Sequence, residues 1–248
     1  MKNILKFEIV LVYYKRPQIV LNALDSIKQL QYTNWHLTFI DDSGDDSFKD
    51  TLLEYGLDNK KVTYVASLDS EEIKKGQGGS RHGYFMNEAI HNSDSDVVVI
   101  LCDDDAIVDG YFEYLDEYYR INPEVNWAYC KLLFFNPTTQ HYLEASTSCE
   151  YSHPGSTYTL NNYEQPLIPM GKLDGSQITF RTKVFKEGDI SYPYPQTRGL
   201  DANIFSKIVE KYGLCYPTYI YGQYKGAFAD QLGNRWTEKG DEFNINNK

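Results

Sequence analysis

The chain lacks any apolar run approaching the ~20 residues that a membrane span requires. Its first residues, 1–6, also lack the long apolar segment of a signal peptide. Positive charge is scarce, because 24 Lys and Arg stand against 35 Asp and Glu and give a formal net charge of −11. This balance excludes a general electrostatic attraction to nucleic acid or anionic membranes, so any phosphate group must be bound locally. We expect a soluble, intracellular (cytoplasmic) protein with no integral membrane segment and no nucleic-acid partner.

Cysteine is scarce as well, with four residues in 248. Their spacing matches neither a zinc site nor a disulfide framework, so we expect reduced structural thiols at Cys102, Cys130, Cys149 and Cys215. The chain has no internal repeat and no low-complexity linker. Its length suffices for one large α/β domain or two closely fused halves.

Strands alternate with helices in the first half of the chain. Short branched runs predict strands at residues 8–14, 35–40, 62–66 and 97–102, and periodic apolar positions predict helices from Pro17, around 85–90 and over 111–121. This alternation favours a mostly parallel sheet flanked by helices.

After Pro123 the chain is richer in Tyr, Pro and Gly. Helices are expected after Arg181 and over 201–212, the latter with Asp201 as its N-cap and Gly213 as its C-cap. The polar stretch from Asp230 onward is expected to be a mobile tail.

The most informative feature is an acidic triplet, Asp103, Asp104 and Asp105, directly after the apolar run 97–102. Open α/β sheets bind ligands beyond the carboxyl ends of their strands. Adjacent carboxylates there repel one another and lose hydration, so a divalent cation or hydrogen-bond donors must compensate. Oxygen ligands of this kind suit Mg²⁺ or Mn²⁺, which share their coordination with substrate phosphates. The alternative is an acidic surface turn.

Several segments, taken in order, resemble glycosyltransferase family 2. They read "EIVLVYYKRP", "FIDDSGDDS", "GGSRHGYFMNEAI", "VVVILCDDD", "GSQITFRTKVF" and "RGLDANIFSKI". The resemblance implies the GT-A fold, a mostly parallel mixed sheet flanked by helices, as a single domain over 1–248. Residues 1–122 would bind the nucleotide sugar, and residues 123–248 would bind the acceptor. It also implies an inverting transferase that moves a sugar from a nucleotide diphosphate to a glycan or other hydroxyl acceptor, with Mn²⁺ or Mg²⁺ on the diphosphate.

The resemblance assigns five residues to the nucleotide: Tyr14, Arg16, Asp42, Arg81 and Asp103. A carboxylate at Asp42 can accept the imide N–H of uracil or thymine, which favours a UDP- or dTDP-sugar. The alternative is that Asp42 caps a turn with the residues after it. A guanidinium at Arg81 suits phosphate oxygens, and its alternative is an ordinary ion pair on a helix surface. The glycines before Arg81 do not have the spacing of a dinucleotide-binding loop.

The metal ligands that the resemblance implies depend on the register. Counting back from Asp109 places the ribose-side acid at Asp103 and the metal ligand at Asp104, whereas a literal Asp-x-Asp gives Asp103 and Asp105. We favour the first and retain Asp105 as a ligand through water. Many relatives have a late His at the metal, but here every His precedes Asp201. The third ligand is then water or phosphate, or the metal affinity is weak.

The acceptor side carries two further candidates. Asp201 matches the family's general base, which accepts the acceptor's hydroxyl proton as the oxygen attacks the anomeric carbon opposite the leaving diphosphate. Its alternative role is that of an N-cap alone. Asp174 matches a polar position that contacts the donor sugar or the acceptor.

Two other classes of protein compete with this interpretation. A phosphatase of the haloacid dehalogenase type also places an Asp-x-Asp after an apolar strand, and residues 103–108 fit it roughly, but that motif normally opens its fold. A non-catalytic carbohydrate-binding protein is the second alternative, since a fold does not determine a function.

Overall fold

The computed structural model describes residues 4–44, 46–66, 81–136, 141–144, 157–160, 163–166, 175–193, 200–213 and 215–226. The elements, in chain order, are β1 (Phe7–Tyr13), α1 (Pro17–Lys28), β2 (Trp35–Asp41), α2 (Lys49–Glu54), a 3₁₀ turn η1 (Asn59–Lys61), β3 (Val62–Ala66), α4 (Arg81–Asn92), β4 (Val97–Cys102), β5 (Ala106–Ile107), α5 (Tyr111–Ile121), β6 (Trp127–Asn136), β7 (His141–Glu144), β8 (Thr157–Leu160), β9 (Tyr163–Pro166), η2 (Gly175–Gln177), β10 (Ile178–Arg181), α7 (Lys183–Lys186), α8 (Leu200–Tyr212) and β11 (Tyr216–Lys225). The expected tail from Asp230 lies outside the described residues.

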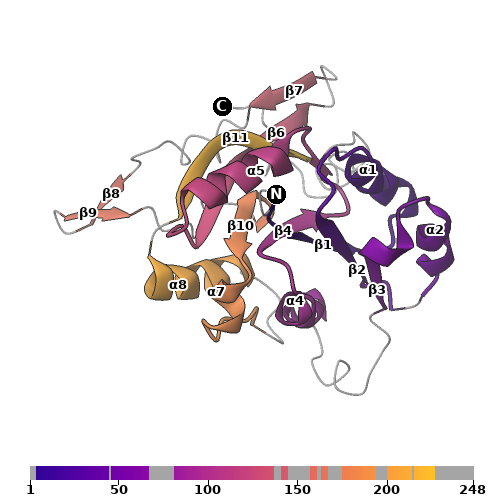
Figure 1. Cartoon of the computed structure of the whole chain (residues 1–248), viewed down its shortest axis with the longest axis horizontal. Helices are drawn as coiled ribbons and strands as arrows, with labels where there is room; N and C mark the ends of the chain where they lie inside the picture. The colour runs from indigo at the N-terminus through magenta and orange to yellow at the C-terminus, as the bar shows by residue number, and fades with distance from the viewer. Residues whose placement is uncertain are drawn as a thin grey trace, which may run out of the picture.

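The main sheet has nine strands within the described part of the chain, in the order β3-β2-β1-β4-β10-β6-β11-β5, with β7 paired to β6. The first four are parallel, since β1 pairs in parallel with both β2 and β4, and β2 with β3. Strand β10 then joins β4 to β6 in antiparallel pairing. The mixed α/β sheet and its parallel first half confirm the predicted fold class. A two-stranded β8–β9 sheet lies apart from the main sheet (Figure 1).

Each central strand sends alternate side chains to two separate cores. From β1, Phe7, Ile9 and Leu11 join the core formed with α1, α2 and α5, whereas Val10 joins the core formed with α4, α7 and α8. The same alternation divides β4, so that both faces of the sheet are covered by helices. A strand buried on both faces is apolar throughout, which is why 97–102 reads as a continuous branched run.

The helix boundaries follow recognisable signals. Helix α1 begins at Pro17 as predicted, because proline lacks the N–H that a first-turn residue leaves unbonded. Helix α8 ends at Tyr212, and Gly213 follows it as the expected C-cap, with a φ of 74° and an N–H that donates to the Val209 carbonyl at 2.9 Å. The same helix begins at Leu200, one residue earlier than expected. Asp201 is therefore a first-turn residue, and the N-cap prediction for it is wrong.

Strand β11 bends across the sheet to reach the end of β4. It runs parallel to β6, with two register shifts between Pro217 and Gln223, and then pairs antiparallel with β5 (Figure 1). Gly222 lies in this bend, and a Cβ there would stand 2.5 Å from both Cys130 Sγ and Tyr111 Cζ. Only glycine fits such a close approach. The bend brings the last residues of β11 beside the acidic triplet.

None of the helices in the described ranges is both long enough and apolar enough to cross a membrane.

Candidate functional site

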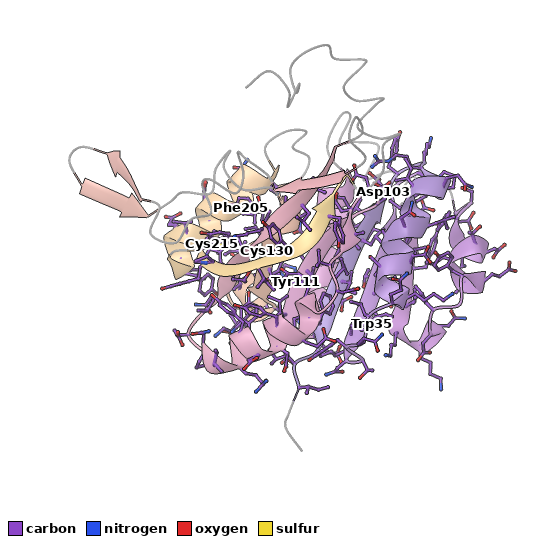
Figure 2. The ribbon with its side chains drawn as sticks, turned by 90° about the horizontal axis from the view of Figure 1, so that it is seen from above. Trp35, Asp103, Tyr111, Cys130, Phe205 and Cys215 are labelled. Atoms are coloured by element: carbon purple, nitrogen blue, oxygen red, sulfur yellow. The ribbon has the colours of Figure 1, made fainter. Side chains whose placement is uncertain are left out.

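Six of the nine predicted site residues lie at one edge of the sheet, where the parallel strands β1, β2 and β4 end: Tyr14, Arg16, Asp42, Asp103, Asp104 and Asp105. Tyr13 is in register with Asp41, and Val12 with Cys102, so the segments that follow these strands leave the sheet together. Two backbone bonds hold them: Asp42 N–H donates to the Tyr13 carbonyl at 2.9 Å, and Asp103 N–H to the Val12 carbonyl at 3.2 Å. Figure 2 shows Asp103 at this edge and Trp35, the first residue of β2, at the opposite one.

Asp103 is held from two sides by the segment that follows β1. Its carboxylate accepts the Tyr14 N–H at 3.0 Å and the Arg16 Nε–H at 3.1 Å, and Arg16 Nη2 pairs with its other oxygen. The turn that makes this possible has Lys15 in the left-handed region, at φ 51°. Burial raises the pKa of Asp103 to about 6, against the opposing effect of the Arg16 charge and the Tyr14 amide. For Arg16 burial acts to lower the pKa, but the charges of Asp103 and Asp104 outweigh it and raise the pKa.

Asp104 is less tightly held than Asp103. Its Oδ2 lies 3.3 Å from Arg16 Nη1, a longer and weaker contact than those that Arg16 makes to Asp103. The side chain is 9% exposed, against 3% for Asp103. Of the two, Asp104 therefore offers the carboxylate that a ligand reaches more easily.

Asp105 faces the end of β11. Its Oδ2 lies 3.0 Å from the Lys225 ammonium, and its Oδ1 accepts the Gly226 N–H at 2.9 Å. Lys225 Nζ also lies 3.4 Å from Ser176 Oγ, in the 3₁₀ turn η2. The Asp105 side chain is fully buried. A metal bound directly by Asp105 would have to share an oxygen with, or displace, one of these donors.

The acids at the end of β2 have separate roles. Asp41 is fully buried and accepts the Ser43 N–H at 3.0 Å, the Ser43 hydroxyl and the Tyr64 hydroxyl at 2.7 Å. Asp41 thus makes the turn-capping bond to Ser43 that the alternative interpretation assigns to Asp42. Asp42 is 9% exposed at the same edge, and Tyr14, which follows β1, is 51% exposed.

Three side chains of the acidic turn could hold a divalent cation. The ligand atoms of Cys102, Asp104 and Asp105 lie within 4.8 Å of one another. Opposite ligands of an octahedral Mg²⁺ or Mn²⁺ stand about 4.2 Å apart, so these atoms are close enough to share one ion if Asp105 shares or gives up one of its present donors. The two carboxylates suit a hard cation, and the thiol suits a softer one. The donor set therefore fits the predicted metal, with Asp104 as its most available ligand.

Three predicted residues have no described side chain. Arg81 is the first residue of α4, and Asp201 the second of α8, whereas Asp174 lies wholly outside the described residues. A helix that connects parallel strands runs antiparallel to them, so the backbone of Arg81 begins α4 on the side of the carboxyl edge. The roles of these three residues stay predictions.

Two residues of the site, Lys225 and Ser176, were not predicted. No sequence pattern places either residue beside the acidic triplet. Lys225 reaches it only through the bend of β11, which was not predicted as a strand. Cys102 was predicted only as a structural thiol.

Solved structures of similar fold include three of one protein, S. aureus TarS. The crystal structure of S. aureus TarS 1–349 superposes with a TM-score of 0.65 at 16% identity, covering 89% of this chain and 60% of that one. The crystal structure of S. aureus TarS superposes with a TM-score of 0.59 at 15% identity, covering 89% of this chain and 36% of that one. The structure of S. aureus TarS 1–349 in complex with UDP-GlcNAc superposes with a TM-score of 0.55 at 16% identity, covering 80% of this chain and 53% of that one. The chain thus covers less than two thirds of each of these proteins, and the likeness shows a shared fold.

The sequence itself settles the family. The model of the family described as Glycosyl transferase family 2 matches residues 8–188, well over half of the chain. The chain belongs to glycosyl transferase family 2, which confirms the predicted family. It also decides against the phosphatase alternative. No curated protein matches the sequence significantly.

Proposed function

We propose that this protein transfers a sugar from a nucleoside diphosphate, with UDP or dTDP favoured, to a hydroxyl acceptor, with inversion at the anomeric carbon and with a divalent cation. The observation that carries the proposal is the convergence of Tyr14, Arg16, Asp42 and the acidic triplet at one edge of the parallel strands. That edge is where α/β sheets bind nucleotides. Family membership and the UDP-GlcNAc complex of TarS support the choice of donor class.

The nucleoside would lie over the ends of β1 and β2. Asp42 would accept the imide N–H of uracil or thymine, which an unprotonated cytosine lacks. The exposed Tyr14 ring offers a flat apolar surface beside it. Asp103, already oriented by Arg16 and the Tyr14 amide, would accept a ribose hydroxyl on the same side.

The diphosphate would lie beside Asp104. A divalent cation bound there, with Asp105 contributing through water, would neutralise charge on the leaving diphosphate. Arg81 would contact phosphate oxygens from the start of α4, because a planar guanidinium matches their geometry.

The acceptor would approach from the second half of the chain. Asp201 would take the proton of the attacking hydroxyl, and Asp174 would contact the donor sugar or the acceptor. Attack from the face opposite the diphosphate inverts the anomeric centre.

The test is a thermal-shift screen of UDP, dTDP, GDP and CDP, each with Mn²⁺ and with EDTA, followed by an assay for nucleoside diphosphate released from nucleotide sugars. A ligand of the native state raises the melting temperature by mass action. We expect UDP or dTDP with Mn²⁺ to give the largest shift. Binding without release in the presence of diverse acceptors would favour the non-catalytic carbohydrate-binding alternative, and no shift with any nucleotide would refute the proposal. Arg120→Met is the control variant, because it removes an arginine of α5 that lies away from the carboxyl ends of the strands and should leave nucleotide binding unchanged.

A further inference from the structure

Lys225 places a fixed positive charge at the acidic turn. Its ammonium lies 3.0 Å from Asp105 Oδ2 and 3.4 Å from Ser176 Oγ, and the side chain is only 19% exposed. The adjacent Gly226 N–H binds the other oxygen of the same carboxylate. Asp105 is thereby held by two neighbouring residues of β11 and the turn that follows it, and the bend at Gly222 leads directly to this contact.

The charges of the acidic turn are largely balanced by the protein itself. Among the side chains described there, three carboxylates face two cations, Arg16 and Lys225. Arg16 bridges Asp103 and Asp104, and Lys225 pairs with Asp105. Only one negative charge of the triplet is left without a compensating charge within this set. A bare divalent cation would meet two fixed positive charges at short range in a partly desolvated site, where repulsion is poorly screened.

We infer that Lys225 occupies the position at Asp105 that a divalent cation would otherwise take, so that the protein binds the cation together with a nucleoside diphosphate and not alone. This inference rests on the proposed function for the identity of the nucleotide. The diphosphate adds negative charge to the site, which offsets the repulsion between Lys225 and the cation. It also supplies oxygen ligands that the protein alone does not provide to the cation. Lys225 is in this sense a positioning residue that makes binding of the cation depend on the nucleotide.

The inference has a simple consequence for variants. Replacing Lys225 by a neutral residue removes the competing ammonium and makes Asp105 available beside Asp104 and Cys102, whose ligand atoms already lie within 4.8 Å. The variant then has a cation site that does not need the nucleotide. A lysine elsewhere on the same sheet has no such effect. Lys131 on β6, whose Nζ lies 5.4 Å from the centre of the Tyr221 ring, is a suitable control.

The experiment is a Mn²⁺ titration of the full chain followed by the electron paramagnetic resonance signal of free Mn²⁺, without nucleotide and then with saturating UDP. We expect the parent protein and Lys131→Met to bind Mn²⁺ weakly without UDP. Lys225→Met should bind it about tenfold or more tightly, because Mn²⁺ then no longer competes with an ammonium for the Asp105 carboxylate. With UDP present, the parent should bind Mn²⁺ tightly, so its affinity rises most on adding the nucleotide.

A double-variant cycle separates the specific effect from a general change of charge. Asp105→Asn removes the carboxylate for which the two cations compete, so Lys225→Met should no longer raise Mn²⁺ affinity in that background. If Lys225→Met does not fold by circular dichroism, Lys225→Gln, which keeps a hydrogen-bond donor for Asp105, takes its place. Equal Mn²⁺ affinity of the parent and the Lys225 variant without UDP would overturn the inference. Absence of UDP binding under all conditions would instead refute the proposed function, because the titration without nucleotide does not depend on it.

Discussion

Arg16 lends itself to a quantitative prediction because it is the main partner of a carboxylate buried within the site. Its side chain is 29% exposed, whereas that of Asp103 is 3% exposed, so Arg16→Met would leave an almost fully buried charge without its partner. Breaking a fully buried pair costs about 3–5 kcal/mol, and the partial exposure of Arg16 lowers our expectation to about 2–3 kcal/mol. For a chain of this size that corresponds to a fall in melting temperature of about 5–10 °C.

The pH dependence of this loss identifies its cause. Burial raises the pKa of Asp103 to about 6 in the folded protein, above the ~3.9 of an unfolded chain. Arg16 acts to lower that pKa, so in Arg16→Met it rises further. The loss of stability is then fully present above the raised folded pKa of the variant, where Asp103 is ionised in both proteins, and declines as the pH falls through that value toward the parent's pKa of about 6. At pH 5 we expect roughly half the loss found at pH 8, or less.

The assay is urea or thermal denaturation of the parent and the variant at both pH values. Arg120→Met is the matched control, since Arg120 and Asp116 form a pair of nearly the same exposure, 30% and 8%, away from the carboxyl ends of the strands. The control should lose stability without losing UDP affinity. Adding Asp103→Asn to Arg16→Met should restore part of the stability, because the uncompensated charge is gone. A loss of equal size at pH 5 and pH 8 would show that Arg16 acts through packing, and the electrostatic reasoning would be refuted.

Three further predictions concern the proposed chemistry. Asp42→Ala should weaken UDP or dTDP binding by roughly 1–3 kcal/mol, the usual cost of a lost hydrogen bond to a charged group, as measured by calorimetry; equal affinity of the parent for UDP and CDP would contradict the assignment. Asp104→Asn should remove most Mn²⁺-dependent UDP binding while the melting temperature changes little, and an undiminished Mn²⁺ effect would move the metal ligand to Asp105. Asp201→Asn should lower the transfer rate about 10²- to 10⁴-fold with UDP affinity nearly intact; a near-parental rate would leave Asp201 with a structural role in the first turn of α8.

The first half of the fold could be predicted because its signals are local. Strands 62–66 and 97–102 and helix 111–121 were predicted with the bounds that the structure has, and the strand predicted at 35–40 lacks only Asp41 at its end. Buried parallel strands are short apolar runs, and their helices have an apolar face and clear end signals such as Pro17. The second half lacks such signals. Strand β11 mixes Tyr, Pro and Gly, and its two register shifts interrupt any alternation of period two.

The same division applies to the site. Tyr14, Arg16, Asp42 and Asp103 each follow a parallel strand, so their proximity follows from the rule that parallel strands end at one edge of the sheet. The partner of each acid could not be foreseen in this way. Asp41 is bound by Tyr64 from the neighbouring strand β3, and Asp105 by Lys225 from a distant one. Such contacts depend on how the sheet curves, and the sequence near either residue does not encode that curvature in a readable pattern.

The contact between Lys225 and Asp105 also affects how the protein is made. These residues are 120 positions apart, and at ribosomal rates of 5–20 residues per second the second follows the first by roughly 6–24 s. During that interval the nascent chain already contains β1, β2, β3 and β4, which together form the parallel half of the sheet, but the acidic turn at the end of β4 has not yet received its last cation. The pair with Arg16 can form early, whereas the pair with Lys225 forms only after β11 has been synthesised and has bent over β6. The acidic turn is therefore completed late in synthesis, although its own residues belong to the first half of the chain.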